Sequence, residues 1–257
     1  MAHSARVWNY WLGGKDHFAA DRVVGDRVRQ VYPGVVDEAR QARAFLRRAV
    51  RFLVSEAGVD QFLDIGTGLP AAENTHETAQ RVEPTCRVVY VDNDPLVLSH
   101  ARALLISGPE GAAALVDGDL RSPDKIIHQA AETLDLSRPV GVILLGVVGH
   151  IGDDDEARSL VGRLMETFAP GSYLVLGDGS APSNQMAEVY RRYNRGGAEP
   201  YFPRTPEQIV RFFAGLDLLP PGVVPTPRWR PDSGEAASPE VLIHCGVARK
   251  PGPKFPT

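Results

Sequence analysis

The sequence FLDIGTGLP at residues 62–70 is a short apolar run that ends in an acid and two closely spaced glycines. Such a run is typical of a strand buried on both faces of a sheet. Glycine has no Cβ atom, so the chain after this strand can turn tightly and approach a ligand closely. The spacing Gly66-x-Gly68-x-x-Ala71 also fits the glycine pattern of dinucleotide-binding folds. The stretch therefore predicts a strand, a turn and a ligand site, and it leaves the ligand open.

Similar apolar runs recur along the chain and alternate with segments that carry helix start signals. We expect strands at residues 61–65, 87–91, 113–116, 140–145, 172–176 and 241–247. We expect helices to begin near Asp94-Pro95, Ser122-Pro123, Asp153 and Thr205-Pro206, and a further helix to span about residues 36–57. Strand, helix and strand joined by short connections imply parallel strands with right-handed crossovers. The prediction is a doubly wound α/β fold with its ligand at the carboxyl ends of the strands.

Composition excludes several classes of protein. The 257 residues carry a formal net charge of −4, so no basic excess exists to neutralise nucleic-acid phosphates. The chain shows neither a signal peptide nor an apolar stretch that could cross a membrane, and we expect a cytoplasmic protein. Cys86 and Cys245 belong to no metal-binding pattern, so we expect no metal site.

Acids at three successive strand ends indicate which cofactor the glycine turn serves. Asp64 can receive a cationic amino group, but its negative charge would be unfavourable beside a pyrophosphate. Asp92 can accept hydrogen bonds from both hydroxyls of a ribose. Asp119 can accept from an adenine amino group, while the backbone next to it, at Leu120, donates to a ring nitrogen. The alternative is that each acid only caps the helix that follows.

Three further stretches make the chain resemble a known family. They are ARVWNYWLGGKDHFAADR at residues 5–22, FLDIGTGLP with Asn74-Thr75-His76-Glu77, and VVYVDNDP at residues 88–95. The order of motifs resembles class I methyltransferases, although Leu69-Pro70 departs from the common glycine loop. The closest resemblance is to an actinobacterial S-adenosylmethionine methyltransferase-like family, long described as a domain of unknown function.

The resemblance implies a Rossmann-like class I methyltransferase fold that binds S-adenosyl-L-methionine. The expected sheet has seven mostly parallel strands with an antiparallel last strand, and a helical extension precedes it. The expected divisions are an N-terminal cap at residues 1–34, one methyltransferase domain at 35–250 and a tail at 251–257. The expected cofactor-binding residues are Tyr10, Gly14, Lys15, Asp64, Gly66, Thr67, Gly68, Asn74, Asp92, Asn93, Asp119, Leu120 and Gly146.

The N-terminal segment suggests a lid over the cofactor. It combines aromatic residues, the Gly13-Gly14 hinge and the pair Lys15-Asp16. An aromatic ring such as that of Tyr10 can pack near a sulfonium, and Lys15 can meet the methionine carboxylate. The alternative is a helix that only packs against the edge of the sheet. Neither this segment nor the proline-rich stretch at 219–239 shows a clear helical or strand period.

Two residues are candidates for a catalytic base. His150 follows the strand whose end faces the methyl group in class I enzymes, and Asp178 follows the next strand. Either residue can instead have a purely structural role. The expected reaction is methyl transfer to a small molecule. Two alternatives stay open, namely a cofactor-binding module without catalysis and an NAD-binding oxidoreductase.

Overall fold

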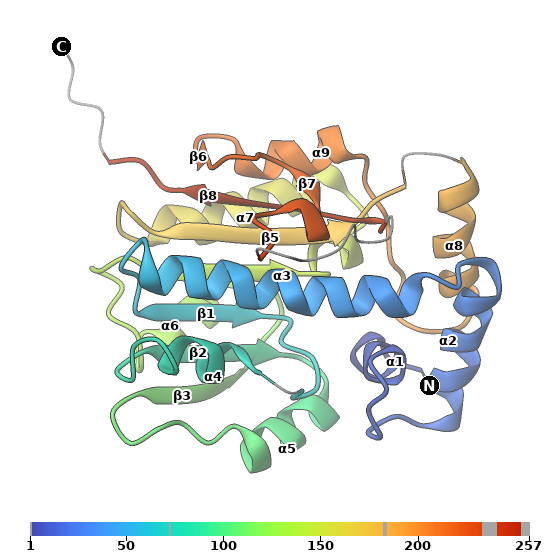
Figure 1. Ribbon diagram of the computed structural model, residues 1–257, viewed down its shortest axis with the longest axis horizontal. Coiled ribbons are helices and arrows are strands. Elements are labelled where there is room, and N and C mark those ends of the chain that lie inside the picture. The colour runs from blue at the N-terminus through green and yellow to red at the C-terminus, as the bar shows by residue number, and fades with distance from the viewer. Residues whose placement is uncertain (1, 72, 182–183, 233–240, 253–257) are drawn as a thin grey trace.

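The computed structural model describes residues 2–71, 73–181, 184–232 and 241–252. One mixed sheet forms the centre of the molecule (Figure 1). Its strands are β1 (Gln61–Ile65), β2 (Arg87–Asp92), β3 (Ala112–Asp117), β4 (Gly141–Leu145), β5 (Tyr173–Gly179), β6 (Asp217–Leu218), β7 (Val224–Pro225) and β8 (Ile243–Arg249). Their spatial order is β3-β2-β1-β4-β5-β8-β6, and β7 also pairs with β8.

The sheet confirms the predicted mixed architecture. Strands β1 to β5 are parallel, and β8 runs antiparallel to β5. All five residues of β1 are buried, as its continuous apolar run predicts for a strand covered on both faces. The short strands β6 and β7 bring the number to eight among the described residues, instead of seven. Strands of two residues are too short to show an alternating pattern, so they could not be predicted.

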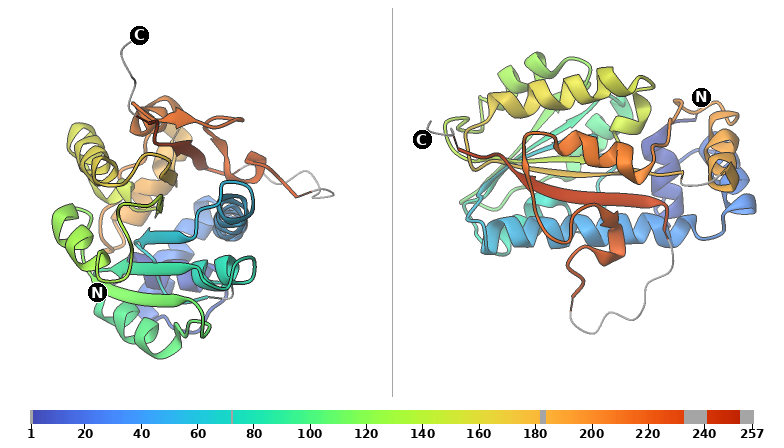
Figure 2. Two further views of the ribbon diagram at one scale, coloured as in Figure 1. Left: turned by 90° about the vertical axis from the view of Figure 1, so that its left-hand side faces the viewer. Right: turned by 90° about the horizontal axis from the view of Figure 1, so that it is seen from above.

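Helices cover both faces of the sheet, which makes the fold doubly wound (Figure 2). They are α1 (Ser4–Trp11), α2 (Ala19–Val31), α3 (Val35–Ser55), α4 (Thr75–Gln80), α5 (Pro95–Leu104), α6 (Pro123–Ala130), α7 (Asp154–Thr167), α8 (Asn184–Asn194) and α9 (Pro206–Val210). Short 3₁₀ turns are η1 (Val148–His150), η2 (Arg211–Phe213) and η3 (Thr226–Arg228). Buried side chains of α3, such as Phe45 and Leu53, pack on one face, and those of α7, such as Leu164, pack on the other.

Most of the predicted helix starts are confirmed. The Asp94 side chain accepts a hydrogen bond from the backbone of Leu96, and Asp153 caps α7 in the same way. Thr205 and Gln208 form a reciprocal capping box at α9. Helix α6 begins at Pro123 as expected, but Ser122 makes no side-chain capping bond. These caps fix the turns that follow the strands, which is where the site lies.

The N-terminal segment is helical, which confirms the helical extension that the family resemblance implies, although its sequence shows no clear period. It folds into α1 and α2, which pack against each other beyond the carboxyl ends of the strands, and α2 also packs against α8 (Figure 1). Val7 and Trp11 on α1, and Val24 and Val28 on α2, are spaced by four residues and buried in one apolar cluster. Tyr193 of α8 completes this cluster from a distant part of the chain. Each helix presents only two such positions, too few for the period to stand out in the sequence.

The proline-rich stretch is also partly regular. Its residues 224–228 form β7 and η3, while residues 233–239 lie outside the described residues, as does the tail from 253. The ring of Trp229 is fully buried and packs edge-on against Phe45, with 5.4 Å between ring centroids. The guanidinium of Arg48 donates to the carbonyls of Thr226 and Trp229. The segment is therefore fixed against α3.

Candidate functional site

The glycine turn after β1 has a backbone that only glycine adopts easily. Gly66 and Gly68 have φ angles of +72° and +67°. A Cβ atom on Gly66 would collide with the side chain of Val147. The backbone N–H of Gly68 donates to Asp92 Oδ2 at 2.9 Å, so the turn is tied to the next strand end. The two glycines therefore bring bare backbone to the carboxyl edge of the sheet.

Asp64 is a buried acid at the base of this turn, with 7% of its surface exposed. Its Oδ2 accepts a hydrogen bond from Thr75 Oγ1 at 2.6 Å. Burial raises the pKa of Asp64 to about 6, while the Thr75 bond and the charge of Arg43 act in the opposite direction. A cationic ligand beside this carboxylate would offset the cost of its burial.

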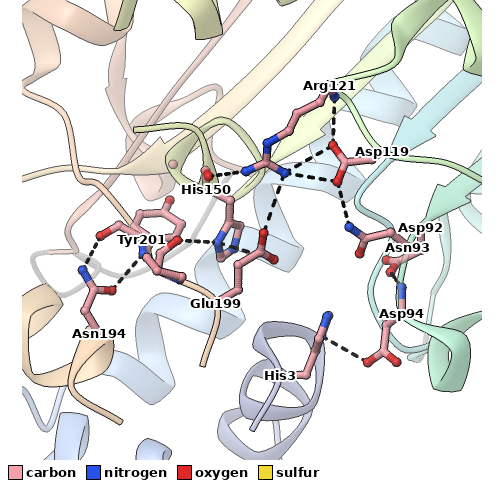
Figure 3. Close-up of polar contacts among 12 residues, drawn as sticks. His3, Asp92, Asn93, Asp94, Asp119, Arg121, His150, Asn194, Glu199 and Tyr201 are labelled. Carbon is pink, nitrogen blue, oxygen red and sulfur yellow. Dashed lines mark hydrogen bonds and ion pairs between the residues drawn. The ribbon is translucent and has the colours of Figure 1, made fainter. Parts of the chain in front are cut away.

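The acids at the next two strand ends are also held in place. Asp92 accepts from the backbone N–H groups of Gly68 and Asp94, and burial raises its pKa. Asp119 lies beside it and accepts from Asn93 Nδ2 at 2.9 Å (Figure 3). The guanidinium of Arg121 lies 3.1 Å from Asp119 Oδ2. The predicted line of acids therefore lies along one edge of the sheet, as its parallel strands require.

Helix α1 is fixed to this edge by buried charges. The guanidinium of Arg6 donates to Asp21 at 3.1 Å and to Asp94 at 2.9 Å. Asp21 is fully buried and also accepts from the backbone N–H of His3. His3 Nδ1 lies 3.1 Å from Asp94 Oδ2. These contacts join α1 and α2 to the start of α5, next to Asp92.

A cavity of about 410 Å³ lies between α1 and the strand ends, within the range of small-ligand sites. We call its lining residues at 64–71, 92–93, 118–121 and 145–151 the strand-end wall. We call its lining residues at 3–16, together with Glu199, the cap wall. The remaining lining comes from α3, β5, η3 and β8.

The structure brings most of the predicted site residues to this cavity. The lining includes Gly14, Asp64, Gly66, Thr67, Gly68, Asp92, Asn93, Asp119, Leu120, Gly146 and His150. All of these except Gly14 lie at or just after the ends of β1 to β4. Gly14 reaches the cavity from the turn after α1, where its backbone packs closely against the side chain of Asn9.

Four predicted residues are not part of the cavity lining, namely Tyr10, Lys15, Asn74 and Asp178. The Tyr10 hydroxyl donates to Asp26 Oδ1 of α2 at 2.6 Å, and Lys15 is exposed. Asn74 accepts from the backbone of Ala71 at the start of α4. None of these three side chains is part of the cavity lining, which corrects the expected lid contacts of Tyr10 and Lys15. An aromatic of α1 does line the cavity, but it is Trp8.

Asp178, the second candidate base, is buried behind the cavity. It accepts from the backbone N–H groups of Gly149 and Gly179, each at 3.0 Å. Burial raises its pKa to about 7, against the charge of Arg204. The carboxylate is not part of the cavity lining, so it holds the turn after β4 in place and does not face a ligand.

His150 stands at the cavity with one nitrogen already engaged. Its Nδ1 lies 2.9 Å from the carbonyl oxygen of Pro200, and its ring packs edge-on against Tyr201 (Figure 3). A carbonyl can only accept, so Nδ1 carries the proton and Nε2 has the free lone pair. Burial lowers the pKa of His150, although the charge of Glu199 raises it.

Several residues of the cavity could not be predicted from local motifs. Arg43 reaches it from α3, Trp8 from α1 and Glu199 from the segment after α8. Thr226 also lines it, and its buried hydroxyl has no hydrogen-bond partner within the described part of the chain. Only the tertiary fold brings these segments together at the cavity.

Two other classes of site are not found in the part of the chain that is described. No group of three or more His, Cys, Asp or Glu residues there could hold a metal ion. Within the same ranges, no helix combines the length and apolar character that a membrane crossing needs.

Comparison with known proteins identifies the cofactor. The family model described as S-adenosyl methyltransferase matches residues 1–251. The chain belongs to this family. It is therefore a methyltransferase that uses S-adenosylmethionine, and the alternative of an NAD-binding oxidoreductase falls away.

Solved structures agree with this family. A member of the DUF574 family from Streptomyces avermitilis ma-4680 is 41% identical, with a TM-score of 0.92, over 97% of this chain and 98% of its own. A protein from Thermobifida fusca YX is 39% identical, with a TM-score of 0.89, over 98% of this chain and 96% of its own. The actinobacterial resemblance is thereby confirmed.

A more distant structure shows the fold alone. Human N-acetylserotonin methyltransferase, in complex with S-adenosylmethionine, is 16% identical, with a TM-score of 0.52, over 97% of this chain and 64% of its own. Among curated proteins, none matches this S-adenosyl methyltransferase.

Proposed function

We propose that this S-adenosyl methyltransferase methylates a small molecule that enters the cavity between the strand-end wall and the cap wall. The observation that carries the proposal is the cavity of about 410 Å³, which α1 and the segment containing Glu199 both help to enclose. A cavity of this size suits a small molecule beside the cofactor. Residues 2–34 serve as its cap, because α1 and the two residues that flank it supply six of its lining residues: His3, Ser4, Ala5, Trp8, Asn9 and Leu12.

Asp64 and Arg43 hold the amino-acid end of the cofactor. Asp64 is ionised above about pH 6 and receives the ammonium group. Arg43 lines the same cavity and interacts electrostatically with Asp64, so a carboxylate can lie beside the guanidinium while the ammonium faces the acid. A zwitterionic end therefore meets one charge of each sign. Arg43 takes the role that the sequence suggested for Lys15.

The other strand-end acids hold the nucleoside. Asp92 accepts two backbone hydrogen bonds and keeps lone pairs for the ribose hydroxyls. Asp119 accepts from the adenine amino group, and the buried Leu120 packs against the base. The bare backbone of Gly66 and Gly68 lets the ligand approach the sheet closely. Thr67, Asn93 and Gly146 complete this side of the cavity.

The cofactor supplies an electrophilic methyl group, and the protein supplies orientation and protection from water. Helix α1 covers the strand ends and excludes bulk solvent from the cavity. His150 is the base for an acceptor that must lose a proton, because its free Nε2 belongs to a residue that lines the cavity.

The acceptor class can be tested directly. Full-length protein is incubated with methyl-labelled S-adenosylmethionine and with either small amines and alcohols, duplex DNA or transfer RNA. The proposal expects label in the small molecules and none in the nucleic acids. Label in nucleic acid, with the small molecules unlabelled, would refute it.

A further inference from the structure

Glu199 places an incompletely paired carboxylate at the cavity. Its oxygens lie 3.8 Å from Arg121 Nη1 and 4.0 Å from His150 Nδ1, both beyond hydrogen-bond distance (Figure 3). Its side chain is 32% exposed and lines the cavity. The carboxylate therefore keeps its capacity to accept hydrogen bonds from a ligand.

The position of Glu199 is fixed by the segment that carries it. Asn194 exchanges two hydrogen bonds with the backbone of Tyr201, which closes the turn between α8 and residue 201. The Tyr201 hydroxyl accepts from the backbone of Gly179 at the end of β5, and the Phe202 N–H donates to the Gly149 carbonyl. Glu199 is thus held next to His150 by contacts to two strand ends.

His150 and Glu199 together suit the capture and deprotonation of a cation. The Pro200 carbonyl fixes the proton on Nδ1 and leaves Nε2 as the basic atom. Burial and the nearby charges of His3 and Arg121 lower the pKa of His150, while Glu199 raises it. The net pKa lies below the ordinary value, so the imidazole is neutral and basic at pH 7.

The charge of the cavity favours a cationic acceptor. Its lining holds five carboxylates and two guanidinium groups, from Asp16, Asp64, Asp92, Asp119, Glu199, Arg43 and Arg121. Among these groups, negative charges exceed positive charges by three. The cofactor brings one net positive charge, from an ammonium, a sulfonium and a carboxylate. The remaining excess attracts a cation and repels an anion.

We propose that the methyl acceptor is an amine, bound as its ammonium by Glu199 and deprotonated by His150 Nε2. This proposal rests on the proposed function and adds the chemical class of the acceptor. An apolar body on the amine fits the apolar part of the lining, which includes Trp8, Leu12 and Ile151.

The step balances with the groups already named. One proton passes from the ammonium to Nε2, and the freed nitrogen lone pair forms the N–C bond to the methyl group. The C–S bond breaks as that bond forms, and its electron pair remains on sulfur, which becomes a neutral thioether. His150 then releases its proton to solvent. No oxidant, reductant or metal takes part in this balance.

The first experiment compares matched acceptors on full-length protein. Binding of S-adenosylhomocysteine is measured first, and failure at this point contradicts the cofactor site itself. The loaded protein is then titrated with 2-phenylethylamine, 2-phenylethanol and 3-phenylpropanoate. We expect the amine to bind at least about tenfold more tightly than either analogue, and with labelled S-adenosylmethionine we expect methylation on nitrogen. Equal binding of the three, or methylation of the alcohol or the acid, overturns the amine proposal and leaves the cofactor site intact.

The second experiment separates the two roles. Glu199→Gln should raise the KM for the amine about tenfold or more, with unchanged affinity for S-adenosylhomocysteine. Glu188→Gln is the matched control, because Glu188 lies on α8 outside the cavity lining, paired with Arg191 and Arg192. It should behave as wild type. An unchanged KM in Glu199→Gln contradicts capture by this carboxylate.

His150→Asn tests the proton transfer through its pH profile. An asparagine amide can still donate to the Pro200 carbonyl but has no basic nitrogen. Wild-type kcat should level off above about pH 6.5, once an imidazole has lost its proton. In the variant, kcat should fall about 100-fold and then rise about tenfold per pH unit toward an amine pKa of about 10. Profiles of the same shape in both proteins overturn the role of His150.

Discussion

The strand-end wall and the cap wall of the cavity are positioned in different ways by the chain. Residues of the strand-end wall directly follow β1 to β4, so a few neighbouring residues determine each part of it. Residues of the cap wall come from α1 and from the segment after α8, and buried contacts hold them in place. Local backbone geometry therefore controls the strand-end wall, while long-range ion pairs and packing control the cap wall. A substitution that changes only the local backbone, or only a long-range ion pair, can test this difference between the two walls.

The largest effect should come from breaking the ion bridge that holds the cap. Arg6 is 11% exposed and joins Asp21 and Asp94, whose side chains are 0% and 4% exposed. Arg6→Gln removes the guanidinium charge from both acids and should lower the free energy of unfolding by about 3 kcal/mol. Urea unfolding and hydrogen exchange should show the loss, with the faster exchange in α1 and α2.

The control for this variant is Arg40→Gln. Arg40 makes an exposed ion pair with Asp37, and such pairs contribute little. We expect no measurable change in stability. If Arg6→Gln also left the free energy of unfolding unchanged, the cap wall would not depend on the buried ion pairs of Arg6.

A smaller but more local effect is expected in the strand-end wall. Gly66→Ala adds a Cβ to a residue with φ of +72° and drives it into Val147. The turn must shift away from its ligand, so affinity for S-adenosylhomocysteine should fall about 100-fold, a loss of about 2.7 kcal/mol. Calorimetric titration measures this change.

Gly162→Ala is the matched glycine control. Gly162 lies within α7, and a Cβ there meets no atom within 4 Å. The variant should gain up to about 1 kcal/mol of stability and bind the ligand as wild type does. Equal affinities for both glycine variants would contradict a backbone requirement at Gly66.

The pH dependence of cofactor affinity should reveal the buried acid. The ammonium of S-adenosylhomocysteine prefers ionised Asp64, so binding lowers the pKa of this acid from its raised value of about 6. Affinity should therefore be highest above pH 7 and fall about tenfold by pH 5, because roughly one tenth of the acid stays ionised there. An ordinary aspartate would lose charge only near pH 4. A constant affinity between pH 5 and 7.5 would contradict the assignment.

The smallest effect should come from the buried hydroxyl of Thr226. It has no hydrogen-bond partner within the described residues, so its burial is uncompensated. Thr226→Val keeps the shape and should stabilise the protein by about 1 kcal/mol. Thermal unfolding without ligand measures this, and a loss of stability would show that the hydroxyl is satisfied in solution.

The strand-end wall could be predicted because its causes are local. The buried run at β1, the glycines after it and the acids at 64, 92 and 119 all lie next to the strand ends that place them. Parallel strands bring these ends to one edge of the sheet. The order of strands and helices was therefore enough to predict that the three acids lie along that edge. The same locality explains why the caps at Asp94, Asp153 and Thr205 were predicted correctly.

The cap wall could be predicted only in outline. The segment at 1–34 suggested a lid, but the expected contacts of Tyr10 and Lys15 were wrong. Which face of a short helix turns inward depends on what packs against it, which for α1 is α2 and α3. Arg43 and Glu199 were missed because their neighbours in the cavity lie far away in the sequence. Asp178 follows a strand as the cofactor acids do, but its carboxylate turns to backbone donors of the neighbouring loop.

Calorimetric titration of S-adenosylhomocysteine into Asp64→Asn, beside Glu38→Gln, tests the central claim most directly. Both acids are buried with raised pKa values, about 6 and about 7, but only Asp64 lines the cavity. At pH 7.5 the account predicts about 100-fold weaker binding for Asp64→Asn, as for loss of a buried charge partner, with undiminished stability, and wild-type binding for Glu38→Gln. Wild-type affinity in Asp64→Asn would contradict it.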